Sequence, residues 1–107
     1  MAEVENKRVM KSLKQYLKKV KKYFEIDKAI LFGSRARGDY LLSSDVDLII
    51  VSKDFKNLQF RQRMEELLMF WDEKIDLEVI GYTPEEFEKK KKQIGIVQQA
   101  LKEGIFI

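Results

Sequence analysis

The sequence predicts an α+β fold of two layers, in which a small mixed β-sheet has helices packed on one face. Two observations predict it: apolar residues recur at three- and four-residue steps in two long segments, and three short runs have an extended pattern. The expected order is helix, strand, strand, helix, strand, helix. A chain of 107 residues fits one domain but not a catalytic domain plus a substrate-binding domain, so we expect residues 1–107 to form a single domain.

The first half of the chain predicts one helix followed by two strands. Within residues 4–24, apolar side chains fall on one helical face. They are Val9, Met10, Leu13, Tyr16, Leu17, Val20 and Phe24. Residues 29–32 form a short apolar run that Gly33 stops, and residues 46–51 are rich in β-branched side chains. Both of these segments are therefore predicted to be strands.

The next segment, residues 58–71, predicts a second helix because its apolar side chains share one stripe, which we expect to lie in the core. The stripe consists of Phe60, Met64, Leu67, Leu68 and Trp71. Residues 74–80 then return to an extended pattern and predict the third strand.

A strong helix start follows the third strand. Thr83 can cap the helix, Pro84 suits its first position, and Glu86 can reach back to complete a capping box. This last helix is predicted to end around Gly104, with a break near Gly95.

The residue types that the chain lacks restrict its chemistry. There is no cysteine, which excludes disulfides, thiolate nucleophiles and cysteine-zinc sites. There is no histidine, the commonest general base, so acid-base or metal chemistry must rest mainly on carboxylates. The composition is typical of a soluble globular protein, and no apolar run approaches the length that spans a bilayer. Since a secretory signal is also missing, we expect a cytoplasmic protein without membrane association.

Positive charge is concentrated in the first predicted helix. Between Lys7 and Lys22 there are eight Lys or Arg residues and no acidic one, although the net charge of the chain is only +3. Such a stretch can bind nucleic acid or an acidic partner. We interpret it, like residues 89–92, as a solvated helix face, so direct nucleic-acid binding is not expected.

Two aspartates mark the start of the second predicted strand. Since successive side chains of a strand point to opposite faces, Asp45 and Asp47 project on the same side. Two like charges on one face repel, and they call for a compensating cation or for water. Magnesium prefers oxygen ligands and commonly takes one or two carboxylates plus substrate phosphates. The pair therefore predicts a magnesium site, with a solvated turn as the alternative.

A third carboxylate strengthens this prediction. In the third predicted strand, Asp76 and Glu78 share one face. Three carboxylates around two metal ions are the usual equipment for in-line phosphoryl transfer. We prefer Asp76 to Glu78 as the third ligand and as the base for the acceptor proton. The reason is that Asp76 is nearer the start of its strand, level with the aspartate pair if the strands run side by side.

The residues after the first predicted strand suit a phosphate site. Gly33 allows the backbone to approach a phosphate closely, and Ser34 adds a hydroxyl donor beside exposed amides. Arg35 and Arg37 can bind phosphate through their guanidinium groups. The alternative is a simple turn with two surface arginines.

These residues together form one signature: Gly33-Ser34, ten intervening residues, then Asp45-x-Asp47. It resembles the signature of the nucleotidyltransferases of the DNA polymerase beta superfamily, and so implies the polymerase beta-like nucleotidyltransferase fold. Residues 33–38 and 44–48 look especially like the minimal nucleotidyltransferase antitoxin family of bacteria and archaea. Residues 75–77 match the third carboxylate strand of that family.

The resemblance implies roles for the site residues. Gly33 and Ser34 are expected to contact the phosphates of a nucleoside triphosphate, Asp45 and Asp47 to bind magnesium, and Asp76 to be the third ligand or the base. Two Mg²⁺ ions and ATP as the nucleotide donor are the expected cofactors. Similar proteins are antitoxins encoded beside a helical HEPN-type toxin, and some of them transfer AMP from ATP to a toxin tyrosine. A cognate HEPN-type toxin is therefore the implied partner, in a homo- or hetero-oligomer.

Two alternatives to an adenylyltransferase stay open. The chain can be a non-catalytic antitoxin that masks its toxin by binding, with apolar helix residues such as Phe60 and Trp71 at the interface. It can also transfer a nucleotide to a small molecule such as an aminoglycoside, although the chain has no second domain to grip one. A template-directed polymerase is not expected, because the chain has no room for domains that hold nucleic acid.

Overall fold

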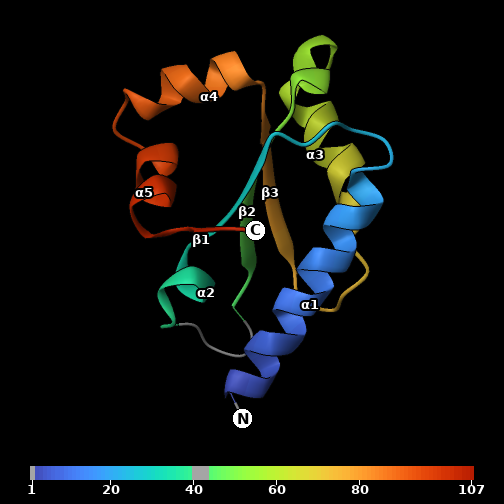
Figure 1. The fold of residues 1–107 in the computed structure, drawn as a ribbon, viewed down its shortest axis with the longest axis vertical. Coiled ribbons are helices and arrows are strands. Elements are labelled where there is room, and N and C mark those ends of the chain that lie inside the picture. The colour runs from blue at the N-terminus through green and yellow to red at the C-terminus, as the bar shows by residue number, and fades with distance from the viewer. Residues whose placement is uncertain (1, 40–43) are drawn as a thin grey trace.

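A four-stranded mixed β-sheet forms the centre of the fold (Figure 1). The computed structural model describes residues 2–39 and 44–107. The strands lie in the order β3-β2-β1-β4, in which β2 and β3 are parallel and the other neighbouring pairs are antiparallel. Their bounds are β1 Lys28–Phe32, β2 Val46–Val51, β3 Leu77–Tyr82 and β4 Ile105–Phe106. The predicted mixed sheet is confirmed, and the two-residue strand β4 is added to the predicted order.

Five α-helices and one 3₁₀-helix accompany the sheet within the described residues. They are α1 Ala2–Val20, α2 Ser34–Arg37, η1 Lys53–Asn57, α3 Phe60–Leu68, α4 Pro84–Lys91 and α5 Ile96–Glu103. The break predicted near Gly95 separates α4 from α5. The short α2 and η1 were not predicted, because segments of four or five residues show no helical periodicity. None of the described helices is long and apolar enough to cross a membrane.

Different helices cover the two faces of the sheet (Figure 1). On one face, named here the α1 face, strand residues such as Leu31, Leu48 and Val79 pack with α1 and α3. On the other, the α5 face, Ile30 and Ile49 pack with α4 and α5. The prediction that the helices pack on one face is therefore wrong. The central strand β2 is apolar on both sides, and both sides must be removed from water.

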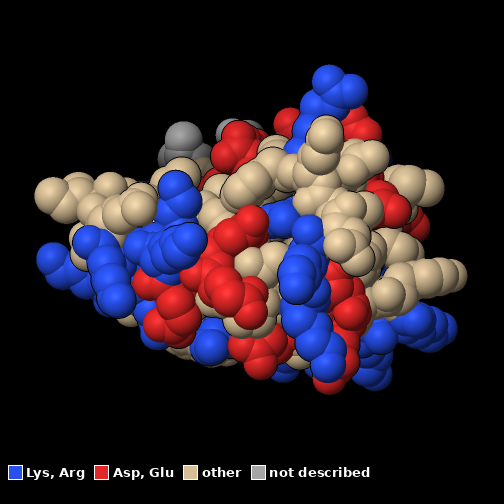
Figure 2. Space-filling view, turned by 90° about the horizontal axis from the view of Figure 1, so that it is seen from above, with Lys and Arg blue, Asp and Glu red and all other residues tan. Residues whose placement is uncertain are grey.

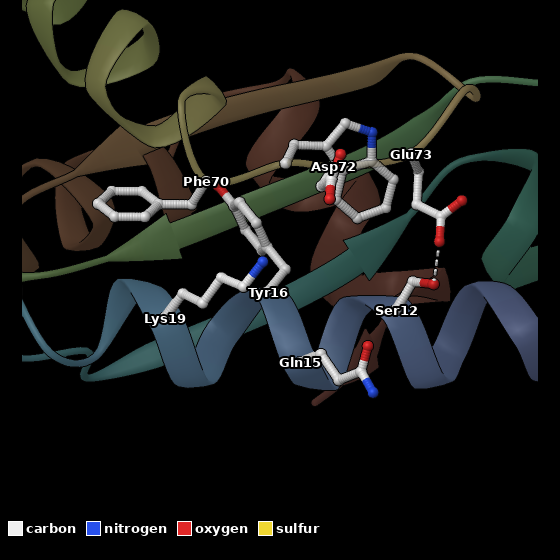
Figure 3. Close-up of a pocket in the computed structure, with 8 residues that line it drawn as sticks. Ser12, Gln15, Tyr16, Lys19, Phe70, Asp72 and Glu73 are labelled. Atoms are coloured by element: carbon white, nitrogen blue, oxygen red, sulfur yellow. Dashed lines mark hydrogen bonds between the residues drawn. The ribbon is translucent and has the colours of Figure 1, made fainter.

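Hydrogen bonds from Ser12 and Tyr16, among others, connect the longest helix, α1, to the rest of the α1 face. It ends at Val20, earlier than predicted, where the chain turns. The hydroxyl of Tyr16 donates to the carbonyl oxygen of Leu67 at 2.7 Å. The hydroxyl of Ser12 donates to the carboxylate of Glu73 at 2.6 Å (Figure 3). These bonds connect α1 to α3 and to the loop that leads into β3.

The apolar stripe predicted for α3 is only partly in the core. Leu67 is fully buried, whereas Phe60, Met64 and Leu68 are 43%, 37% and 42% exposed. The expectation that all of these side chains lie in the core is wrong. An arginine, Arg63, takes the inward position instead and is only 4% exposed.

The buried guanidinium of Arg63 explains this orientation of α3. It donates to the carbonyl oxygens of Leu58 at 2.9 Å and Gly81 at 3.1 Å, and it pairs with the carboxylate of Glu86 at 2.6 Å. Because a buried cation needs such partners, these three partners fix the side of α3 that faces the sheet. Phe60, Met64 and Leu68 lie to one side of Arg63 on α3 and are left partly exposed as a consequence.

The start of α4 is as predicted. The amide of Glu86 donates to the hydroxyl of Thr83 at 3.2 Å, and the amide of Thr83 donates to the carboxylate of Glu86 at 2.8 Å. Pro84 occupies the first turn. The predicted capping box is confirmed, and Glu86 thus serves both the cap and the ion pair with Arg63.

Candidate active site

Four acidic residues lie where the parallel strands β2 and β3 begin. Asp47 and Glu78 are register partners, so their side chains lie side by side on the α5 face. Asp45 and Asp76 immediately precede the two strands, and the amide of Val46 donates to the carbonyl oxygen of Asp76 at 2.8 Å. Asp45 is therefore level with Asp76. Each of them lies two residues before the member of the pair Asp47 and Glu78 on its own strand.

The surroundings of Asp47 disfavour its charged form. Burial raises the pKa of Asp47 to about 6, and a hydrogen bond with Glu78 and the charges of Glu78 and Asp45 act in the same direction. The guanidinium of Arg37 has the opposite effect on this pKa. A carboxyl group in such a place gains most from a nearby cation. The environment of Asp47 is therefore suited to a hard divalent ion.

Gly33 brings the end of β1 against the carboxylate of Asp47. Phe32 is the register partner of Asp47, and the chain turns at Gly33 with φ of 75°. A Cβ atom at position 33 would overlap the Oδ2 atom of Asp47. Only glycine combines this positive φ with so close an approach. The predicted phosphate turn and a predicted metal ligand are thus direct neighbours.

Arg35 has a backbone partner that the sequence did not indicate. Its side chain is buried, and its Nε and Nη2 atoms donate to the carbonyl oxygen of Ser44 at 3.2 Å and 3.1 Å. Arg35 thereby holds the chain immediately before Asp45. Its contact with phosphate stays a prediction.

Arg37 is more exposed and interacts with two acids. Its guanidinium pairs with Asp39 at 3.2 Å and with Glu103 of α5 at 3.0 Å, and both hydrogen bonds raise the pKa of Arg37. Arg37 is also close enough to Asp47 to lower the pKa of that carboxyl group. It therefore brings positive charge to the carboxylates, while phosphate contacts by Arg37 and Ser34 stay predictions.

The predicted metal ligands lie near one another but do not form a closed site. Across residues 2–39 and 44–107, no group of three His, Cys, Asp or Glu side chains is arranged to hold a metal ion. The direct neighbour of Asp47 is Glu78, whereas Asp76 was the expected one. Carboxylates from two adjacent strands suit magnesium, which keeps coordination positions for water and phosphates. Metal binding by Asp45, Asp47 and Asp76 stays a prediction.

A groove with a volume of about 390 Å³ opens beside Asp47 and Glu78. Its other lining residues are apolar and come from the strands, from α3 and from the start of α5: Phe32, Met64, Leu68, Leu77, Val79, Ile80 and Ile96. This volume falls within the range of sites for small molecules, roughly 300–1,000 Å³.

A second hollow lies between α1 and the loop after α3 (Figure 3). It is lined by residues such as Tyr16, Lys19 and Glu73, and its volume is about 70 Å³. It is on the α1 side of the sheet, away from Asp47. Its size and position make it a poor site for a nucleotide.

Known proteins that resemble this chain are nucleotidyltransferases. The sequence profile of the nucleotidyltransferase domain family matches residues 13–107. Two proposed protein adenylyltransferases of Methanocaldococcus jannaschii are similar. One is 40% identical over 53 residues, which are 50% of this chain and 54% of that protein. The other is 46% identical over 43 residues, which are 38% of this chain and 43% of that protein. The chain thus spans about half the length of the curated relatives that it matches.

A solved structure of a proposed nucleotidyltransferase from Sulfolobus solfataricus has the same fold. Its TM-score is 0.73 at 26% sequence identity, and the match covers 98% of this chain and 84% of that chain. The residues that the family profile matches span the Gly33 turn and the carboxylates at the start of β2 and β3. On these grounds the chain belongs to the nucleotidyltransferase domain family.

Proposed function

We propose that the protein is a magnesium-dependent adenylyltransferase, which moves AMP from ATP onto a hydroxyl group of a partner protein in the cytoplasm. The observation that carries this proposal is the group of carboxylates at the start of β2 and β3, one of which, Asp47, lies against the Gly33 turn. The names of the two M. jannaschii relatives support a protein as the acceptor.

Each site residue has a role in this reaction. Gly33 and Ser34 bind the phosphates of ATP through backbone amides and a hydroxyl group. Asp45 and Asp47 hold magnesium, with Asp76 as the third ligand, and two ions are expected. Magnesium, when bound, offsets the charge of the phosphates and makes the acceptor hydroxyl more acidic.

The transfer itself is one in-line displacement. The acceptor oxygen forms a bond to the α-phosphorus of ATP while the bond to the pyrophosphate oxygen breaks. Asp76 takes the proton of the acceptor hydroxyl, and pyrophosphate leaves with the bridging oxygen. Arg37 offsets negative charge beside Asp47, and Arg35 keeps the entrance of β2 in place through Ser44.

The acceptor in this proposal is a tyrosine of a cognate HEPN-type toxin, so the chain acts as an antitoxin and forms a hetero-oligomer with it. The resemblance of residues 33–38 and 44–48 to minimal nucleotidyltransferase antitoxins supports this choice. The chain has no histidine, so its carboxylates must act as bases. A carboxylate can take the proton of a hydroxyl acceptor, and a hydroxyl acceptor therefore suits this site.

The test is to incubate the chain with the protein encoded beside its gene, ATP and magnesium. The mass of the partner should increase by one adenylate, and peptide mapping should place it on a tyrosine. Asp45→Asn should abolish the gain, whereas Glu88→Gln, which removes an exposed carboxylate of α4, should leave it unchanged. Absence of any gain with the wild-type chain, or an equal gain with Asp45→Asn, contradicts the proposal.

A non-catalytic antitoxin is the second candidate, because the exposed side chains of Phe60, Met64 and Leu68 offer a surface that a toxin can cover. It predicts that Asp45→Asn and Asp47→Asn chains still rescue the growth of cells that express the toxin. Loss of rescue by both variants excludes this candidate.

A further inference from the structure

Exposed apolar side chains gather beside the carboxylates. Of the nine large hydrophobic side chains exposed among the described residues, five lie on α3, in the loop between α4 and α5, or at the start of α5: Phe60, Met64, Leu68, Ile94 and Ile96. Met64, Leu68 and Ile96 line the groove that contains Asp47 and Glu78. Ile96 also lines a hollow of about 160 Å³ together with Ile94, so the two hollows border the same side chain. A gathered apolar surface of this kind marks an interaction site.

The apolar residues of α3 form a regular stripe. Phe60, Met64 and Leu68 recur at intervals of four residues and span about 12 Å along the helix. Phe60 is held in place by the edge of the Tyr82 ring, with ring centroids 5.4 Å apart, and by the guanidinium of Arg63 at 5.0 Å. The stripe is longer than one nucleobase or sugar ring, and its length suits a segment of polypeptide.

The order of the strands places this stripe on the acceptor side of the site. Gly33 follows β1 on one side of Asp47, whereas α3 packs with β3, which lies on the other side of Asp47. In an in-line displacement the nucleophile enters opposite the leaving group. With the leaving pyrophosphate at the Gly33 turn, the acceptor enters from the side of α3.

Positive charge borders the far end of the apolar surface. Lys90 lines the hollow that contains Ile94 and Ile96, and Lys89 and Lys92 are exposed nearby in the sequence. Figure 2 shows Lys and Arg side chains gathered at the left, where α4 ends, while charges of both signs intermix elsewhere on this side. Acidic residues on a bound segment would complement these lysines.

We propose that the groove between α3 and α5 docks an apolar segment of the acceptor protein, bordered by acidic residues, and thereby brings the acceptor hydroxyl to the carboxylates at the start of β2 and β3. The inference rests on the proposed function, because it names how the protein acceptor is bound. Burial of Met64, Leu68 and Ile96 supplies affinity, and the flexible methionine adapts to the shape of the segment. A cationic sugar offers no apolar segment to cover this surface.

The kinetic test compares exposed residues of α3 with the exposed residue that follows its last turn. Met64→Gln combined with Leu68→Gln alters the groove, and Met69→Gln is the control, since Met69 is 81% exposed and does not line the groove. The double variant should raise the KM for the partner protein roughly ten-fold, with the KM for ATP and the rate at saturating partner unchanged. Met69→Gln should change neither constant. Lys90→Glu should raise the KM for the partner a few-fold at low salt.

A second test detects docking without chemistry. Because the chain has no cysteine, Leu68→Cys and Met69→Cys can each be labelled with a photoreactive maleimide at one position. Both are made with Asp47→Asn, which blocks transfer, and are mixed with the protein encoded beside the gene. Crosslinking should occur from position 68 and not from position 69.

The outcomes separate this inference from the proposed function. An unchanged partner KM in the double variant, or equal crosslinking from both positions, overturns the docking site even when AMP transfer is intact. An equal rise in the KM for ATP assigns the groove to the nucleotide and also overturns it. Crosslinking from position 68 without AMP transfer by the wild-type chain overturns the proposed function and supports the docking site. A wild-type chain that neither binds nor modifies the partner overturns both.

Discussion

The two faces of the sheet use the same strands but differ in what they leave open. On the α1 face, one apolar cluster extends from α1 across the strands to α3. On the α5 face, the apolar cluster covers only the part of the sheet beneath α4 and α5. Where β2 and β3 begin, that face carries Asp47 and Glu78 instead, beside a groove.

This difference shows how a small fold combines rigidity with a reactive site. Val46 and Asp47 are adjacent in β2. Val46 is fully buried on the α1 face, whereas Asp47 is on the α5 face and has a raised pKa. Because side chains alternate along a strand, a packed core lies directly behind the candidate site. Substitutions on the α1 face should therefore change stability, and those at the start of β2 on the α5 face should change activity.

The largest effect is expected for Asp47→Asn. AMP transfer should fall about 1,000-fold, which corresponds to ~4 kcal/mol of transition-state stabilisation. Stability near neutral pH should be unchanged or higher, because the substitution removes a charge that its surroundings disfavour. Initial rates and urea unfolding measure the two quantities. Asp72→Asn, which removes an exposed carboxylate near α1, is the control and should change neither. A loss of stability that matches the loss of activity would contradict the separation of the faces.

Two neighbouring leucines of α3 test the packed face. Leu67→Ala should lower the free energy of unfolding by about 2–5 kcal/mol, because Leu67 is fully buried in the α1 core. Leu68→Ala should lower it by less than about 1 kcal/mol, because Leu68 is 42% exposed. Chemical denaturation of both variants measures the difference. Equal losses would mean that α3 presents a different side to the sheet.

The periodic parts of the fold could be predicted from the sequence. The strand predicted over residues 46–51 has those bounds, and the predicted cap of α4 at Thr83 is present. Helices on both faces could also have been expected, since the four consecutive apolar residues 48–51 leave no polar side of β2 for water. The orientation of α3 could not, because the partners of the buried Arg63 come from three separate segments.

The candidate site was predictable in its residue types but not in its pairing. The spacing of two in Asp45-x-Asp47 recurs in Asp76-x-Glu78, so a register that aligns the first members also aligns the second. The sequence alone does not reveal that register. From the sequence we therefore prefer Asp76 to Glu78 as the third ligand. The burial of Arg35 could not be predicted from the sequence either. Its guanidinium binds the backbone carbonyl oxygen of Ser44, and every residue type has such a carbonyl.

Substitutions of the two glycines with positive φ, Gly33 and Gly38, distinguish the effect of backbone strain from the effect of crowding at the site. Gly33→Ala and Gly38→Ala should each lower stability by about 1 kcal/mol, because both positions have a left-handed φ. The Cβ at position 33 meets the carboxylate of Asp47, whereas none of the described residues beyond the chain neighbours of Gly38 has an atom within 4 Å of a Cβ at position 38. Gly33→Ala should therefore also reduce AMP transfer roughly ten- to a hundred-fold. Equal activity of the two variants would show that the position of Asp47 is not critical.

The smallest effect is a dependence of stability on pH that Asp47 introduces. Folding raises the pKa of Asp47 from 3.8 to about 6, so between these values the folded chain binds more protons than the unfolded chain. The contribution of Asp47 to stability is fully present below pH 3.8 and is lost as the pH rises through about 6. With allowance for solvent screening, the change is about 1 kcal/mol. The quantity to measure is the free energy of unfolding of the wild type minus that of Asp47→Asn, in EDTA.

This difference should become less favourable to the wild type between about pH 4 and about pH 7, and a constant difference would contradict the raised pKa of Asp47. Magnesium should oppose the loss, because it binds the ionised carboxylate and competes with protons for it. Added magnesium should therefore stabilise the wild type near pH 7 and have little effect near pH 4, and Asp47→Asn should respond weakly at both. Equal stabilisation of both chains by magnesium would place the ion away from the start of β2 and β3.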